Sequence, residues 1–212
     1  MSLRHQGTEG YAEQAESLIE AYDGIAFEDV HRPVLHLLPE PPARVLDVGA
    51  GTGRDAAALA ARGHRVVAVE PTALFREAAQ MRHPSDRITW VDDGLPALAS
   101  LEDRTGGFDL ILLSAVWMHL DLPARKQAMA RLSAMLAPDG VMILSLRHGP
   151  VPAGRRMFPV GADETAALAT AHGLREVARQ EKRDSTFKRP DVHWTLLAFR
   201  AGPAPDEGSR HV

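Results

Sequence analysis

The chain has 212 residues, of which 45% are hydrophobic and 25% charged, so its length and composition are those of an ordinary single-domain globular protein. It contains no cysteine, which excludes disulfides, thiolate metal sites and cysteine nucleophiles. The net charge of −4 argues against a protein whose main task is to bind phosphate backbones. No apolar run approaches the roughly 20 residues that cross a bilayer, and the first residues lack the apolar core of a signal peptide, so the expected location is the cytoplasm.

Helical stretches precede the first predicted strand. The pattern predicts a helix over residues 11–22 and a second helical stretch to about Leu38, so residues 1–40 are expected to form an N-terminal helical cap. Tyr11 and Tyr22 fall on one face of the first helix. This apolar stripe either packs the helix onto the rest of the chain or covers a ligand site, and the two roles are compatible.

Short β-rich runs then alternate with helical stretches. The runs share near-continuous valine, isoleucine and leucine, which is typical of strands buried on both faces. The predicted strands span residues 44–49, 65–70, 88–93, 108–116 and 140–148. The predicted helices span residues 53–62, 72–82, 95–103 and 121–137. This alternation predicts an α/β, doubly wound, mostly parallel sheet with helices on both faces.

A further helix and two strands are predicted near the end of the chain. The helix spans residues 163–172, and strands over 174–184 and 192–200 have only seven residues between them. Such a short connection predicts an antiparallel addition to the sheet edge. The main domain is therefore expected over residues 41–200, and the proline-, glycine- and charge-rich residues 201–212 are expected to be disordered.

The stretch VLDVGAGTGRDA (residues 45–56) places three glycines directly after the first predicted strand. Ligands of open α/β sheets lie beyond the carboxyl ends of the strands, and glycine lets ligand and backbone approach closely. A dinucleotide fingerprint would be G-x-G-x-x-G, but Arg54 stands in place of the third glycine. Asp47 would also be poorly placed beside a pyrophosphate. A glycine-rich turn without a ligand is the other alternative.

The same stretch resembles the first motif, D/E-x-G-x-G-x-G, of the class I S-adenosylmethionine (SAM)-dependent methyltransferases. Glu70, at the end of the second strand, matches the family's acid that binds the ribose hydroxyls of SAM. The third strand ends in VDDGLP, which resembles the family's acid beside the adenine, with Asp92 favoured over Asp93. Either aspartate could instead cap a helix. The resemblance covers about residues 40–148.

The resemblance implies a seven-stranded sheet with strand order 3-2-1-4-5-7-6, its last strand antiparallel, and S-adenosylmethionine as the cofactor. It also indicates the small-molecule, type 11/12-like group of these methyltransferases. The residues that it places around SAM are Asp47, Gly49, Ala50, Gly51, Gly53, Arg54, Glu70, Pro71, Asp92, Asp93, Gly94, Leu95, Ser114, Ala115 and Val116.

Two sequence features that the chain lacks exclude certain classes of methyl acceptor. Residues 114–117 read Ser-Ala-Val-Trp, where enzymes that methylate exocyclic amines of DNA or glutamine amides carry an N-P-P-Tyr/Phe turn. Without cysteine, C5 methylation of cytosine through a cysteine adduct is impossible. A small-molecule acceptor is therefore predicted, with a nucleic acid or protein acceptor, or a SAM-binding protein without catalysis, as alternatives. We expect a monomer or homodimer.

Methyl transfer from a sulfonium needs mainly alignment and desolvation, with a base where the acceptor carries a proton. His119, after the fourth strand, and His148, at the end of the fifth, are the candidate bases. For each, the alternative is a hydrogen-bonded, partly buried histidine. The candidate acceptor contacts are Tyr11, Tyr22, Trp117 and Arg155. Arg155 belongs to an insert that could cover the pocket or form a solvated loop. The scattered histidines predict no metal site.

Overall fold

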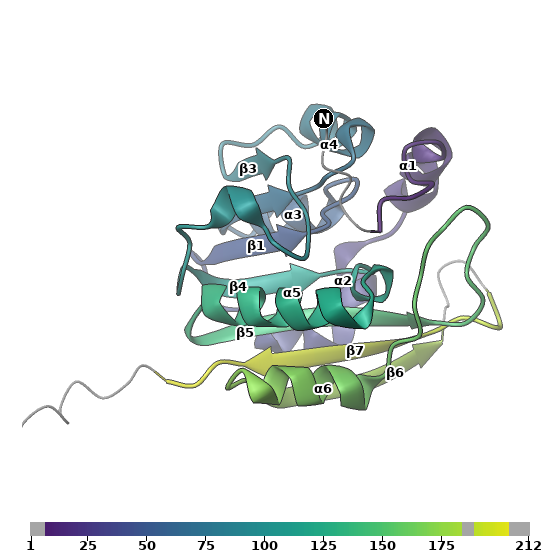
Figure 1. Ribbon diagram of the computed structural model, residues 1–212. Coiled ribbons are helices and arrows are strands. Elements are labelled where there is room, and N and C mark those ends of the chain that lie inside the picture. Colours follow the sequence, from purple (N-terminus) through teal and green to yellow (C-terminus); the bar gives the residue numbers. More distant parts are fainter. Residues whose placement is uncertain (1–6, 184–188, 204–212) are drawn as a thin grey trace, which may run out of the picture.

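The computed structural model describes residues 7–183 and 189–203. Its centre is a seven-stranded sheet in the order β3-β2-β1-β4-β5-β7-β6 (Figure 1). Strands β1 to β5 pair in parallel, and β7 runs antiparallel to both β5 and β6, which confirms the predicted fold class and strand order. The strands are β1 (Arg44–Val48), β2 (Arg65–Val69), β3 (Ile88–Val91), β4 (Phe108–Leu113), β5 (Leu136–His148), β6 (Arg175–Arg183) and β7 (His193–Arg200).

Helices cover both faces of this sheet. In Figure 1, α5 and α6 lie in front of the sheet, whereas α2 and α3 lie behind it. The helical elements are α1 (Ala15–Asp23), α2 (Phe27–His31), η1 (Arg32–Leu37), α3 (Arg54–Ala61), α4 (Ala73–Arg82), η2 (Ala99–Leu101), η3 (Trp117–His119), α5 (Leu122–Met135) and α6 (Ala162–Ala171). The second helical stretch, expected to about Leu38, consists of the two short elements α2 and η1.

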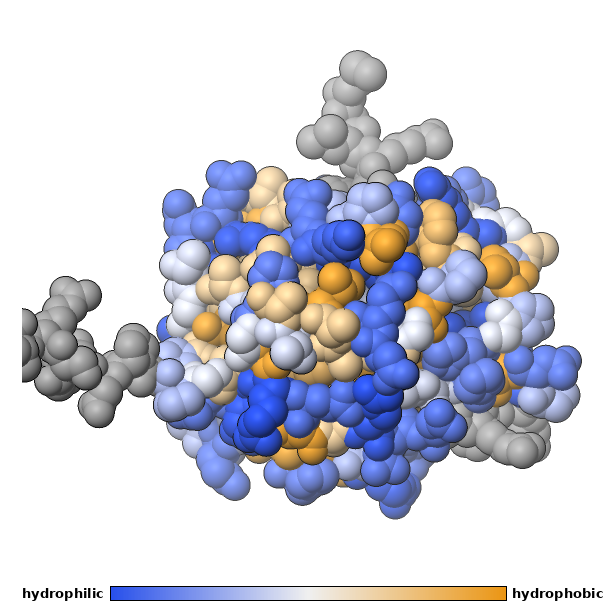
Figure 2. Space-filling view, turned by 60° about the horizontal axis from the view of Figure 1, so that its bottom comes forward, coloured by the Kyte–Doolittle hydropathy of each residue, from blue (hydrophilic) through white to orange (hydrophobic). Residues whose placement is uncertain are grey.

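The two-sided burial explains the apolar strand runs. In β1, Val45 belongs to the core cluster that includes residues of α3, whereas Leu46 and Val48 belong to the cluster that includes residues of α5. Because successive side chains of a strand point to opposite faces, both sets must be apolar when helices cover both sides. Outside, hydrophobic side chains form small patches between hydrophilic ones on the face shown in Figure 2.

Several predicted boundaries differ from the structure. The first helix, expected over residues 11–22, begins only at Ala15, so Tyr11 precedes it. The helix expected over 95–103 is only the turn η2, because Leu98 has a φ of 48°, in the left-handed region, which interrupts a right-handed helix. Strand β5, expected over 140–148, begins at Leu136, and its pairing with β4 shifts by three residues between Phe108 and Leu110. Strand β4 ends at Leu113, three residues early. Of the expected tail, residues 204–212 lie outside the described residues.

Candidate functional site

The three glycines after β1 form a turn at the carboxyl edge of the sheet. Gly49, Gly51 and Gly53 have φ angles of 70°, 55° and 83°, in the region that glycine favours. A Cβ on Gly49 would lie 2.5 Å from Cγ2 of Val116, and one on Gly53 would lie 2.8 Å from the ring of Trp90. Gly53 therefore lets the start of α3 pack closely on the sheet, and Gly49 lets the turn approach the segment after β4.

We expect Gly49→Ala to lower the free energy of unfolding by about 1–3 kcal/mol, because alanine is strained at this φ and its Cβ displaces Val116. Urea unfolding followed by tryptophan fluorescence measures the change. The control is Gly24→Ala, since Gly24 has a φ of −88° and nothing within 4 Å of an added Cβ. Equal stability of the two variants would contradict the steric role of Gly49.

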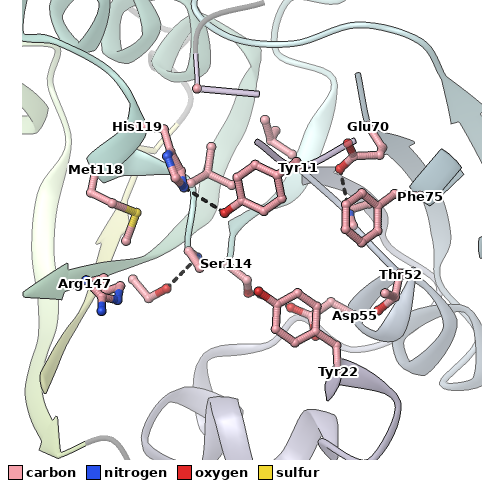
Figure 3. A pocket seen from close by; sticks show the side chains of 18 of the residues that line it. Tyr11, Tyr22, Thr52, Asp55, Glu70, Phe75, Ser114, Met118, His119 and Arg147 are labelled. Atoms are coloured by element: carbon pink, nitrogen blue, oxygen red, sulfur yellow. Dashed lines mark hydrogen bonds between the residues drawn. The ribbon is translucent and has the colours of Figure 1, made fainter. Parts of the chain in front are cut away.

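A cavity of about 390 Å³ opens at this edge of the sheet, a size typical of small-molecule sites. It is lined by the ends of β1, β2, β4 and β5, by residues of β6 and β7, and by the N-terminal segment with α1. In Figure 3, Glu70, Phe75 and Thr52 lie on one side of the cavity and Arg147 and Met118 on the other, with Tyr11 between them. The cavity therefore has two chemically different ends.

Two buried acids from neighbouring strands face the first end. Asp47 is 1% exposed, and its Oδ2 has no hydrogen-bond partner among the described residues. Burial, with the charge of Asp55 nearby, raises the pKa of Asp47 well above its usual range. Glu70 accepts hydrogen bonds from the backbone N–H groups of Gly51 (2.9 Å) and Thr72 (2.8 Å). Burial raises the pKa of Glu70, and these hydrogen bonds oppose the rise.

A hydrogen-bonded network around Asp55 holds the floor of this end. The Asp55 carboxylate accepts from Ser114 Oγ (2.6 Å), His31 Nε2 (2.9 Å) and Arg54 Nε (2.5 Å). Burial alone would raise the pKa of Asp55, but His31 and Arg54 hold it below its usual range. Asp55 therefore stays ionised and joins α2, α3 and the end of β4.

His119 and Tyr11 meet in the middle of the cavity. Nδ1 of His119 lies 2.8 Å from the carbonyl oxygen of Arg156, and Nε2 lies 3.0 Å from the Tyr11 hydroxyl. A carbonyl only accepts, so Nδ1 carries the hydrogen, and in the neutral ring Nε2 accepts from the Tyr11 O–H. Burial lowers the pKa of His119, which favours this neutral form. The histidine thus presents an unprotonated nitrogen, through Tyr11, to the cavity.

Two segments distant in sequence close over the cavity. Figure 1 shows the loop after β5 rising beside α1. The Arg155 guanidinium lies 3.5 Å from the centre of the Tyr11 ring and donates to Gln14 Oε1 at 3.0 Å. A Cβ on Gly10 would lie 2.2 Å from the carbonyl oxygen of Gly154. The insert after β5 is therefore packed against the N-terminal segment as a cover.

Comparison with known proteins connects this geometry to a family. Residues 45–140 match the model of a methyltransferase domain family. The structure resembles that of the 1,6-didemethyltoxoflavin N1-methyltransferase of Burkholderia thailandensis, bound to 1,6-didemethyltoxoflavin and S-adenosylhomocysteine, with a TM-score of 0.66 and 26% identity over 90% of this chain and 88% of that one. Residues 45–140 of the chain therefore form a methyltransferase domain of this family.

Two curated relatives of this methyltransferase are trans-aconitate 2-methyltransferases. That of Methylobacterium radiotolerans is 30% identical over 186 residues, which is 81% of this chain and 64% of that protein. That of Deinococcus radiodurans is 28% identical over 157 residues, which is 69% of this chain and 57% of that protein. The chain thus spans less than two thirds of either relative.

Most of the residues predicted around SAM line the cavity of the methyltransferase. They are Asp47, Gly49, Ala50, Gly51, Arg54, Glu70, Pro71, Gly94, Leu95, Ser114, Ala115 and Val116. Of the predicted base and acceptor residues, His119, Tyr11, Tyr22 and Arg155 line it too. The fold therefore gathers most of the residues predicted from the strand ends and the N-terminal segment around one cavity.

The two aspartates after β3 do not line the cavity. The Asp93 carboxylate accepts from the backbone N–H groups of Gly94 and Ser100, both at 2.7 Å, which is the capping role left open as the alternative. The Asp92 side chain is 64% exposed and pairs with Arg76 at 3.0 Å. The backbone of Gly94 and the side chain of Leu95 line the cavity where an acid was expected.

Two other predicted residues also lie away from the cavity. Trp117 is fully buried in the core cluster that includes residues of α5, because the turn η3 directs its side chain inward and leaves Met118 and His119 on the cavity side. His148 bonds to Thr195 Oγ1 at 2.9 Å and stacks on His193 with ring centres 4.6 Å apart. These contacts agree with the alternative interpretation, in which His148 is a hydrogen-bonded, partly buried histidine.

Sequence reasoning missed Arg147, which does line the cavity. Successive residues of a strand point to opposite faces, so Arg147 and His148 cannot both face the ligand. Ser145, two residues earlier, also lines the cavity. The alternation of β5 was therefore the signal that could have found Arg147.

Within the described parts of the chain, no helix is both long and apolar enough to span a membrane. The same residues contain no group of three or more histidine, aspartate or glutamate side chains arranged to hold a metal ion.

Proposed function

We propose that the chain transfers the methyl group of SAM to a small molecule bound in the other end of the same cavity. The observation that carries this proposal is the buried Oδ2 of Asp47, which has no partner among the described residues and belongs to a residue that lines the cavity at the glycine turn. A buried carboxylate oxygen without a donor calls for one, and the ammonium of SAM supplies it. The second end of the cavity leaves room for an acceptor.

The other lining residues fit the remaining parts of the cofactor. Glu70 offers carboxylate oxygens to the ribose hydroxyls, and the side chains of Phe75 and Leu95 offer apolar surface to the adenine. Residues 114–116 leave the methionine part between the glycine turn and the acceptor end. Bound SAM supplies a methyl group already activated by the sulfonium.

The chemistry asked of the protein is alignment and removal of one proton. A nucleophilic oxygen or nitrogen of the acceptor bonds to the methyl carbon as the carbon–sulfur bond breaks, and the electron pair of that bond stays on sulfur. The acceptor proton passes to the Tyr11 oxygen, while the Tyr11 proton passes to His119 Nε2, along the 3.0 Å hydrogen bond between them. His119 is only 5% exposed, which limits competition from water at the end of this relay.

Names of the relatives support a small organic acceptor. The two curated relatives are trans-aconitate methyltransferases, and the toxoflavin-precursor enzyme acts on a heterocycle. A nucleic acid or protein acceptor is less compatible with a cavity closed by the N-terminal segment and the insert after β5.

Calorimetric titration with SAM, and with NAD as the competing cofactor, tests the first step. We expect SAM to bind, NAD not to bind, and Glu70→Gln to weaken SAM binding by about tenfold, because a charge-assisted hydrogen bond to the ribose is lost. Incubation with SAM and a panel of small acceptors, followed by mass spectrometry, tests transfer. NAD binding without SAM binding would overturn the proposal, and SAM binding with transfer only to nucleic acid or protein would replace the acceptor class.

A further inference from the structure

Charged side chains are unevenly distributed around the cavity. The acids that line it, Asp47, Asp55 and Glu70, all lie at the end formed by the glycine turn and β2. Arg54 lies there as well and pairs with Asp55. The lining residues also include Arg147, Arg155 and Arg189, and no described lining residue other than these three acids is acidic. Figure 3 shows Arg147 and Glu70 on opposite sides of Tyr11.

Arg155 is held in place by neutral groups. Its guanidinium stacks on the Tyr11 ring at 3.5 Å, and its Nη2 donates to the Gln14 amide oxygen. Its Nη1 is buried without a hydrogen-bond partner among the described residues. The stacking of the guanidinium on the ring is favourable. The buried N–H group without an acceptor costs free energy unless a ligand provides that acceptor.

Arg147 adds a second fixed cation from the sheet itself. It is only 8% exposed, and its Nη1 donates to the Pro150 carbonyl oxygen at 2.9 Å, which holds the guanidinium at the base of the insert after β5. Burial raises the pKa values of Tyr11 and Tyr22 and lowers the pKa of His119. The positive charges of Arg155 and Arg147 oppose the rise at the two tyrosines and add to the fall at His119, so their field reaches the centre of the cavity. The acceptor end is therefore electropositive.

Resting on the proposed methyl transfer, we propose that the acceptor is a small organic acid whose carboxylate is bound by Arg155 and Arg147. Guanidinium groups match the planar carboxylate and can donate two parallel hydrogen bonds to it. Met157 and Trp194 lie beside Arg147, and Met118 also lines the cavity, so apolar surface is present for a carbon skeleton attached to the carboxylate. An inorganic anion would leave this apolar wall uncovered.

Carboxylate binding also explains why the insert that covers the cavity carries an arginine. Arg155 belongs to the insert after β5 and touches Tyr11 and Gln14 of the N-terminal segment. A carboxylate bound to Arg155 and Arg147 would connect this insert to β5. The acid would therefore be held by the same residues that exclude water from the reacting end.

The test uses the full chain saturated with S-adenosylhomocysteine and a library of small organic acids, each paired with its primary amide and, where available, with the matching phosphate monoester. Trans-aconitate is included. Binding is followed by thermal shift and then by calorimetry. We expect acids to bind and their amides to bind at least about tenfold more weakly. Amides that bind as well as acids, phosphate esters that bind better than acids, or a library without a bound acid would each overturn the inference.

Variants assign the effect to the arginines. Arg155→Gln and Arg147→Gln are each expected to weaken binding of the acid at least about tenfold, and Arg155→Lys to weaken it less because it keeps the charge but loses the planar pair of donors. The control is Arg156→Gln, since the side chain of Arg156 pairs with Glu9 and does not line the cavity. Equal loss in Arg156→Gln would contradict the assignment to Arg155.

The outcome separates this inference from the proposed function. SAM binding with methyl transfer to a neutral acceptor would leave the proposed function standing and overturn the carboxylate assignment. Failure to bind SAM would overturn the proposed function itself. Transfer to an acid, with loss of acid binding in the Arg155 variant, supports both.

Discussion

Asp47→Asn is expected to weaken SAM binding by about 10- to 100-fold and, at the same time, to stabilise the cofactor-free protein at neutral pH. The loss of affinity follows from removing the only charge that Asp47 can offer to an ammonium. The gain in stability follows from burial, because ionised Asp47 is 1% exposed, lies near ionised Asp55, and has an oxygen without a partner among the described residues. Binding and stability should therefore change in opposite directions.

The raised pKa of Asp47 determines whether its contribution to the stability of the folded protein rises or falls with pH. A carboxyl group whose pKa is higher in the folded than in the unfolded state costs nothing below its ordinary pKa of about 3.9. The cost grows as the pH rises between the ordinary and the raised pKa, by about 1.4 kcal/mol per pH unit, and is constant above the raised value. The stability advantage of Asp47→Asn should appear over that same pH range and persist at neutral pH.

Thermal unfolding of cofactor-free protein at several pH values, together with SAM calorimetry, measures both effects. Each kcal/mol gained corresponds to roughly 2–4 °C in Tm for a chain of this size. The matched control is Asp92→Asn, because the Asp92 side chain is 64% exposed, pairs with Arg76 and does not line the cavity. A loss of SAM affinity in Asp92→Asn as large as that in Asp47→Asn would restore the adenine role predicted from the sequence and contradict the structure.

Affinity for SAM should itself rise with pH across the titration of Asp47. The ammonium binds the ionised carboxylate, so the raised pKa of Asp47 in the free protein must be overcome by releasing a proton. Calorimetry in buffers of different ionisation enthalpy counts that proton. Binding without proton release below the raised pKa would place the ammonium elsewhere.

The strand ends could be predicted because neighbouring residues in the sequence indicate them. The glycines after β1 need a bare backbone, and Asp47 and Glu70 stand at the ends of apolar runs. In a parallel sheet these ends lie along one edge, so the sequence alone brings the two acids together. No long-range information was needed for this half of the site.

Side-chain direction was harder to predict, because it depends on one-residue differences. Asp93 turns back to cap the segment after β3, and neighbouring Asp92 turns outward to Arg76. Arg147 and His148 face opposite sides of β5, although both stand at its end. Predicting where a strand ends therefore does not identify which of its last residues faces the ligand.

Contacts between distant segments were beyond the sequence. Tyr11 and His119 are 108 residues apart, yet their side chains form a 3.0 Å hydrogen bond. The N-terminal helix was expected either to pack or to cover the site, but its periodicity does not say which partner it meets. The pairing depends on how the loop after β5 places the Arg156 carbonyl against His119, which only the folded chain specifies.

That pairing supports the second large effect, on turnover. We expect His119→Gln to lower kcat by about 10²- to 10⁴-fold for an acceptor that must lose a proton, and Tyr11→Phe to do the same, because each interrupts the relay from the acceptor to Nε2. In the wild-type protein, kcat should rise with pH through the pKa of His119, which burial lowers below the ordinary value of 6.5. The rising limb should vanish in His119→Gln.

Rapid-quench assays of methyl transfer, with SAM affinity measured separately, distinguish the relay from a structural role. Loss of the relay slows transfer while His119→Gln still binds SAM, because His119 lies on the opposite side of Tyr11 from Glu70, the residue expected to bind the ribose (Figure 3). His148→Gln is the matched control, since His148 is bonded to Thr195 and does not line the cavity. Full turnover in His119→Gln, with its acid limb unchanged, would show that the acceptor reacts without a protein base. In that case, alignment in the closed cavity would account for catalysis.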